Sequence, residues 1–189
     1  MVHCRQQGLH LWTVDYGLLS NNQQQSTSNE KPTTKMQQYF TKLFKYNDWA
    51  NNLILDTLSK NEIQDPEVYK IFSHVINAQF IWMSRITGNK ALHKVVWSVH
   101  SLDDLKKFSK ESTALWLEYL SKLDEKELAR SISYSNSEGA SFQNTVSDML
   151  PHIVNHASYH RGQVNKLIRR EGLPVSNTDF ITWRRMVKE

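Results

Sequence analysis

The sequence contains a single cysteine, Cys4, among its 189 residues. One cysteine cannot form an intrachain disulfide, so a disulfide-stabilised framework is excluded and a reducing, cytoplasmic location is expected. Glycine and proline are also scarce, at six and four residues. Because these two residues are the strongest helix breakers, their scarcity favours a helical protein.

Two further absences narrow the class of function. No stretch approaches the roughly 18 consecutive apolar residues of a membrane-spanning helix, so no membrane partner is expected. The formal net charge is +4, and the lysines and arginines do not gather into one run. Nucleic-acid binding requires a concentrated basic surface, so no nucleic-acid partner is expected either.

Residues 1–35 differ in composition from the rest of the chain. The apolar run 9–14 is too short for a signal peptide, and residues 21–35 are almost entirely polar. Such a segment cannot bury enough apolar surface to order itself. We therefore predict a disordered N-terminal extension over 1–35, followed by one domain over 36–189. A targeting or docking arm is the alternative interpretation of the extension.

Four segments carry apolar residues at helical spacing, at about 37–58, 67–87, 102–123 and 145–172. Thr145 followed by Asp148 is close to a capping box at the start of the last segment. Four long helices with short connections predict an all-α fold, a four-helix bundle. Alternating residues around a turn-rich centre at 124–143 predict a small hairpin or irregular flap before the last long helix. The C-terminal tail is expected to lie back over the bundle through Phe180, Ile181 and Trp183.

Three histidines form the main chemical signal. His156 and His160 lie four residues apart on the last helix, where side chains are neighbours and can converge on one ion. His74 lies in the sector between Ile71 and Ala78 of the second helix, so it too points inward. We predict that His74, His156 and His160 hold one divalent metal ion, with open positions for water or substrate.

Simpler interpretations of these histidines compete with this prediction. A lone inward histidine is more often a hydrogen-bonded core residue than a ligand, and a pair at this spacing can arise by chance. The occurrence of all three histidines together favours a metal. Three buried imidazoles that did not share one ion would each need a separate hydrogen-bond partner. His152 lies one turn earlier, about 6 Å along the helix axis. A fourth ligand is one interpretation of it, and a position beside the site is the one that this distance favours.

Other polar residues are assigned no role in the metal site. His93 and His100 lie in the connector after the second helix, with no spacing that ties them to a partner, and are expected to face solvent. Arg161 is expected to point away from the side of the paired histidines, as a surface or interface group. No Glu lies between those histidines, as it does in His-Glu-x-x-His metalloproteases, which argues against peptide hydrolysis.

Four separated motifs occur in an order that resembles a known family. They are Tyr46-Asn47-Asp48-Trp49-Ala50-Asn51, Ser73-His74-Val75, Asn155-His156-Ala157-Ser158-Tyr159-His160-Arg161-Gly162-Gln163 and Thr178-Asp179-Phe180-Ile181. From Met36 to the C-terminus the chain resembles the DinB/YfiT-like metal-binding proteins. These are unrelated to the DNA polymerase that shares part of the name.

The resemblance implies a four-helix bundle, often a homodimer, that binds one divalent metal through three histidines. In this sequence they are His74, His156 and His160, the same set that the helical pattern selects. Nickel, zinc, manganese or iron could occupy such a site. Some relatives are thiol transferases that join a small thiol such as bacillithiol to an electrophile, and others are hydrolase-like.

Three possibilities for the function remain open at this point. The first is a metal-dependent enzyme acting on a small molecule, of the thiol S-transferase or hydrolase type. The lack of a general base slightly favours thiol transfer, because a metal alone can stabilise the deprotonated thiol. The second is a non-catalytic metal-binding or stress-response module. A structural bundle whose core histidines bind no metal is a third, simpler possibility.

Overall fold

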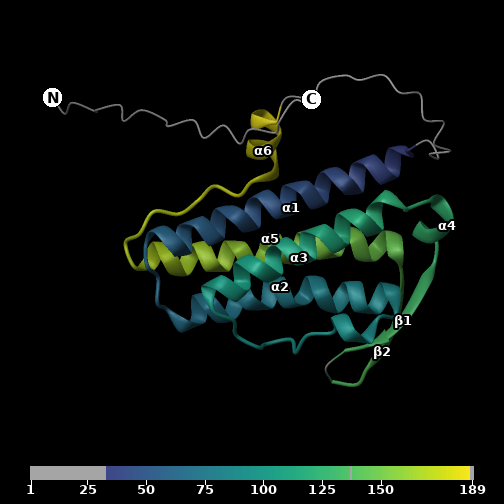
Figure 1. The fold of residues 1–189 in the computed structure, drawn as a ribbon, viewed down its shortest axis with the longest axis horizontal. Helices are drawn as coiled ribbons and strands as arrows, with labels where there is room; N and C mark the ends of the chain where they lie inside the picture. Colours follow the sequence, from purple (N-terminus) through teal and green to yellow (C-terminus); the bar gives the residue numbers. More distant parts are fainter. Residues whose placement is uncertain (1–32, 137, 188–189) are drawn as a thin grey trace. The chain divides into compact units, whose positions relative to one another are not determined.

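The computed structural model describes residues 33–136 and 138–187, and within them four long helices form the body of the domain (Figure 1). They are α1 (Lys35–Lys60), α2 (Pro66–Thr87), α3 (Leu102–Ser121) and α5 (Val146–Arg170). The helix α1 packs most extensively on α3, and α2 packs most extensively on α5. The prediction of an all-α four-helix bundle is confirmed.

Local sequence signals set the ends of these helices. Thr34 caps α1, and Thr145 forms the expected capping box with Asp148 at the start of α5. Each box satisfies backbone N–H groups that have no partner within the helix. The helix α2 ends at Gly88, whose φ of 72° is a left-handed conformation that glycine adopts without steric cost.

The smaller elements lie between and after the long helices. A 3₁₀ turn, η1 (Lys90–Leu92), follows α2, and the short helix α4 (Glu125–Leu128) follows α3. The strands β1 (Ser131–Ser135) and β2 (Ser141–Thr145) pair in antiparallel register, with Tyr134 opposite Phe142. This pairing confirms the small hairpin predicted before the last long helix.

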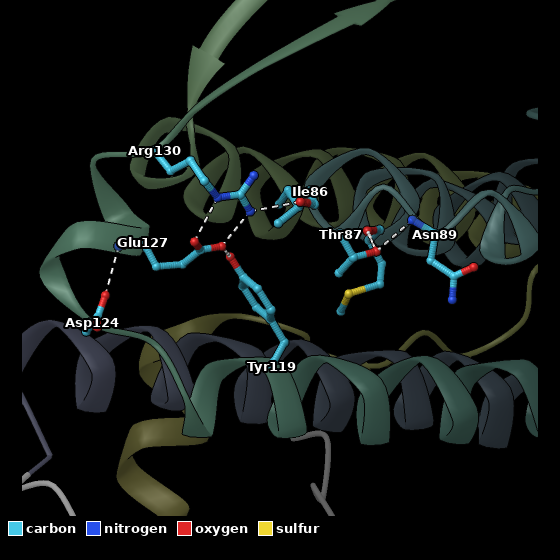
Figure 2. A network of polar contacts seen from close by, with 8 residues as sticks. Ile86, Thr87, Asn89, Tyr119, Asp124, Glu127 and Arg130 are labelled. Atoms are coloured by element: carbon cyan, nitrogen blue, oxygen red, sulfur yellow. Dashed lines mark hydrogen bonds and ion pairs between the residues drawn. The ribbon is translucent and has the colours of Figure 1, made fainter.

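A charged network fixes the start of the hairpin against the end of α2 (Figure 2). The Arg130 guanidinium donates to both Glu127 carboxylate oxygens, at 2.8 and 2.6 Å, and to the Ile86 carbonyl at 2.8 Å. Tyr119 of α3 donates to the same carboxylate at 2.6 Å. The Glu127 carboxylate of α4 therefore binds both Tyr119 of α3 and Arg130, the residue before β1. Through its bond to the Ile86 carbonyl, Arg130 holds the start of the hairpin beside the last turn of α2.

The C-terminal helix α6 (Phe180–Met186) covers part of α1. Trp183 is buried, and the ring of Phe180 packs edge-on against Tyr46 at a centroid distance of 5.2 Å. Tyr46 also donates to the Thr178 carbonyl at 2.8 Å. Ile181, expected to pack here, is instead 56% exposed, because it lies on the outer side of this short helix.

A buried polar layer connects all four long helices. Arg161 of α5 donates to the amide oxygens of Asn47 and Asn51 on α1, at 2.6 and 2.8 Å. Asn47 in turn donates to Gln79 of α2 at 3.3 Å, and Ser112 of α3 donates to the same Gln79 oxygen at 3.0 Å. Both the oxygen and the nitrogen of the Asn47 side chain are therefore hydrogen-bonded within the bundle.

The expectation that Arg161 is a surface or interface group is wrong, since its side chain is fully buried. Arg161 lies four residues after Ala157 and three before Val164, both buried on the inner stripe of α5. Within the described residues its guanidinium has no carboxylate partner, and neutral amide and hydroxyl oxygens accept its hydrogen bonds instead. The charge thus sits inside the bundle because α1 supplies two aligned amide oxygens.

No helix in the described part of the chain is long and apolar enough to cross a membrane. The prediction for residues 1–35 concerns positions of which 1–32 lie outside the described residues, so it stays a prediction.

Candidate metal centre

The packing of α2 on α5 brings the three predicted histidines together. His74 projects from α2 and is 8% exposed, and His156 and His160 project from successive turns of α5. The His74 ring lies 5.0 Å from the His156 ring and 4.8 Å from the His160 ring, measured between centroids. One potential ligand nitrogen from each residue lies within 4.8 Å of the other two.

Hydrogen bonds orient two of these rings. The Nδ1 atom of His74 lies 3.1 Å from the Val96 carbonyl, which can only accept, so Nδ1–H donates and Nε2 carries the lone pair. The Nδ1 atom of His160 lies 2.7 Å from the Gln163 amide oxygen, which likewise leaves its Nε2 unprotonated. Partners of this kind fix the tautomer and ring orientation of metal-binding histidines in proteins.

The spacing of the donor atoms fits a shared ion. Two nitrogens that each lie about 2.0–2.1 Å from one metal are about 2.9–3.4 Å apart at angles between octahedral and tetrahedral. The Nε2 atoms of His74 and His156 are 3.2 Å apart. The group of His74, His156 and His160 could therefore hold a divalent metal ion.

The surroundings of His74 and His156 favour the neutral imidazole, which is the form that binds metal. Burial, followed by the neighbouring His160, His74 and His152 in that order, lowers the pKa of His156 to about 3. Burial also lowers the pKa of His74, although its bond to the Val96 carbonyl acts in the opposite direction. A protonated imidazole at either position would lie beside the other rings with no carboxylate in the cluster to compensate.

The connector between η1 and α3 shields one side of the centre. Trp97 stacks on the His74 ring, with centroids 4.0 Å apart and planes 14° from parallel. His100 holds this connector in place: its Nε2 lies 2.7 Å from the Asn77 side-chain oxygen, and its backbone N–H donates to Ser73 at 3.0 Å. The connector therefore places Trp97 and the Val96 carbonyl against His74.

The two connector histidines differ in their surroundings. His93 is exposed, as expected. The expectation that His100 faces solvent is wrong, because its ring is half-buried and packs edge-on against Phe108 at 5.0 Å. The spacing of residues along the sequence does not indicate this role, since the partners of His100 lie on α2 and α3.

His152 lies next to the three histidines but is not one of the group. Its ring is exposed, 5.6 Å from the His156 ring, and 5.0 Å from the Trp82 ring. Its position agrees with the expected role beside the site. Val96, Trp97 and Gln163 also contact the ligand rings, and the sequence assigned none of them a role.

The residues of the site can bind and orient, but they supply no evident proton donor or acceptor. The cluster of potential ligands consists of three imidazoles and contains no Asp or Glu. A neutral three-nitrogen set leaves a divalent ion with its full charge and with open coordination positions. Such a centre can act as a Lewis acid toward a small molecule.

Comparison with known proteins gives two matches. Residues 36–187 match the model of the DinB family. The chain is also similar to the protein DinB of Bacillus subtilis (strain 168), with 30% identity over 169 residues, which cover 81% of this chain and 98% of that protein. The family match includes all three histidines and, apart from Lys35, all of the four long helices.

Proposed function

This chain belongs to the DinB family, and we propose that it binds one divalent metal ion through His74, His156 and His160 to activate a small thiol. The single observation that carries this proposal is the convergence of the three imidazoles, two of them with Nε2 freed by a hydrogen bond at Nδ1. Nickel, zinc, manganese and iron are the candidate ions, and an all-imidazole donor set suits zinc, nickel or iron better than manganese.

The roles of the residues follow from their contacts. His74 and His160 present Nε2 because the Val96 carbonyl and the Gln163 side chain occupy their Nδ1 atoms. Trp97 covers one face of His74 and limits access of water from that side. When bound, a divalent ion would supply the Lewis acidity that favours the deprotonated form of a thiol.

The lack of an acid–base group favours thiol transfer over hydrolysis. An unperturbed thiol has a pKa of about 8.5, so it needs little further help to lose its proton near neutral pH. Attack by water on an amide or ester usually draws on a general base as well as a metal. Transfer of a low-molecular-weight thiol to an electrophile is therefore the reaction that this set of residues supports best.

A non-catalytic metal-binding or stress-response module is the alternative. The same missing acid–base group is the observation that favours it, because three ligands alone suffice for binding. We also propose a homodimer and a cytoplasmic location, the first on the resemblance to the family and the second on the single cysteine. Light scattering of the purified protein would test the first of these.

A turnover screen separates the enzyme from the binding module. Protein loaded with zinc, nickel, manganese or iron is incubated with small thiols plus an aromatic halide electrophile, and separately with ester and amide substrates. We expect thiol conjugation that His160→Ala abolishes and that His93→Ala, a matched change at an exposed histidine, leaves intact. Activity that survives both His74→Ala and His160→Ala would refute the proposed site, and no turnover with any substrate would favour the binding module.

A further inference from the structure

A second group of side chains lies beside the candidate metal centre, toward the hairpin. It contains a cation, Arg85 of α2, placed over two aromatic rings. The Arg85 guanidinium carbon is 4.6 Å from the ring centroid of Trp82 and 4.6 Å from that of Tyr134. One Nη2–H also donates to the Ser135 carbonyl of β1 at 3.1 Å. The guanidinium is therefore oriented by two rings and one backbone bond.

The charge of Arg85 has no acidic partner in the described residues. Its side chain is half-buried, and the bond to Ser135 is its one hydrogen bond within 33–136 and 138–187. Two other partly exposed cations are neutralised, since Arg130 pairs with Glu127 at 2.6 Å and Lys70 pairs with Glu67 at 3.2 Å. Arg85 is thus a positioned cation with several N–H groups left for an external acceptor.

The position of Arg85 on α2 turns it toward the metal centre. It follows His74 by eleven residues, which is three helical turns and about 20°, so both residues share one face of the helix. A series of contacts connects the two sites: His156 to His152 at 5.6 Å, His152 to Trp82 at 5.0 Å, and Trp82 to Arg85 at 4.6 Å. One extended small molecule can therefore touch both.

The chemistry of the free N–H groups indicates what Arg85 would bind. A guanidinium edge matches the two oxygens of a carboxylate in a planar, bidentate arrangement. A carboxylate carries a single negative charge, which balances the single positive charge of Arg85. A phosphate monoester carries about −1.5 to −2 at neutral pH and would leave charge uncompensated beside the Trp82 and Tyr134 rings.

We propose that Arg85 binds a carboxylate of the substrate and thereby selects acidic thiols. This inference rests on the proposed function, because the thiol end of the same molecule is assigned to the three histidines. Trp82 and His152 lie between the two ends and would contact the body of the ligand. Eleven residues of α2 rise about 16 Å along the helix axis, and the side chains of His74 and Arg85 cover part of that span. The carboxylate would therefore lie at the far end of a molecule about as long as an extended tripeptide, which spans about 10 Å.

The test compares glutathione with its diethyl ester, which lacks both carboxylates. Each probe is titrated by calorimetry into zinc-loaded wild type and into zinc-loaded Arg85→Gln, Arg85→Lys and Lys70→Gln. Lys70→Gln is the matched control, because it removes the same charge from the same helix on the other side of His74 and takes away a cation that Glu67 already neutralises. Zinc content and thermal midpoint are measured for every variant.

We expect wild type to bind glutathione about tenfold more tightly than the diester, as one charge-assisted bidentate contact would give. Arg85→Gln removes this preference by weakening glutathione alone, Arg85→Lys keeps part of it, and Lys70→Gln keeps all of it. Equal weakening of both probes, or a preference that survives Arg85→Gln, overturns the inference while the proposed function stands. If the zinc-loaded protein binds neither thiol, the proposed function fails and the inference fails with it.

Discussion

Replacing Arg161 by methionine tests the buried polar layer that holds the ligand helix α5 against α1. Methionine has nearly the same helix propensity as arginine, so the substitution acts through the lost hydrogen bonds. The Arg161 guanidinium is the only hydrogen-bond partner that the described residues provide for the amide oxygens of Asn47 and Asn51. Both asparagines are buried, at 2% and 1% exposure, so Arg161→Met leaves two orphaned acceptors.

The expected cost follows from these two groups. A buried polar group without a partner costs about 1–3 kcal/mol, and removal of the unpaired cation offsets part of the sum. We expect a net loss of about 3 kcal/mol in the free energy of unfolding, or a fall of roughly 6–12 °C in the thermal midpoint for a chain of this size. Urea denaturation followed by circular dichroism measures it.

Two further variants make this prediction specific. Arg169→Met changes an exposed arginine of the same helix and should shift stability by less than about 0.5 kcal/mol. Adding Asn51→Leu to Arg161→Met removes one orphaned oxygen and should recover about 1–2 kcal/mol of the loss. If Arg161→Met matches wild type within about 0.5 kcal/mol, the polar layer is not a source of stability and the reasoning is refuted.

Three other predictions concern the site and its support. Gln163→Leu removes the bond that orients His160 and should weaken zinc binding about tenfold or more; a dye-competition titration measures it, and unchanged affinity contradicts the role. Metal-free protein should lose stability as pH falls from about 6.5 toward 3, because the unfolded chain takes up a proton that His156, with its pKa lowered to about 3, resists when folded. Urea curves from pH 7.5 to 5 should show this, and His156→Gln should flatten the slope; an equal slope in both proteins speaks against it. Tyr119→Phe removes a bond to the Glu127 carboxylate and should cost about 1.5–3 kcal/mol of stability. Thermal unfolding measures this loss, and an unchanged thermal midpoint would contradict the prediction.

The sequence predicts the helices well because their signals are local. The apolar spacing, the capping box at Thr145 and the glycine after α2 act within a few residues of the chain. The same holds for the pair His156 and His160, because residues four apart on a helix are always neighbours on its surface. His74 could be added because its own helix turns it inward, and one packed helix pair was enough to bring it to the other two.

The features that the sequence missed depend on partners far along the chain. The spacing of Arg161 from Ala157 and Val164 places it on the inner side of α5. Its charge, however, favours a surface position. Only the two amides of α1, more than 100 residues away, explain why a buried guanidinium is tolerated there. The expectation for His100 is wrong for the same reason, because its partner Asn77 lies on α2, 23 residues earlier in the chain.

The central claim is that three histidines hold one metal ion, and metal content measures it directly. Protein is loaded with zinc, dialysed, and analysed by plasma mass spectrometry for wild type, His156→Ala and the exposed control His93→Ala. The account predicts about one zinc per chain in wild type and in His93→Ala, and a small fraction of that in His156→Ala. Wild type that retains almost no metal, at a level that His156→Ala does not change, would contradict it.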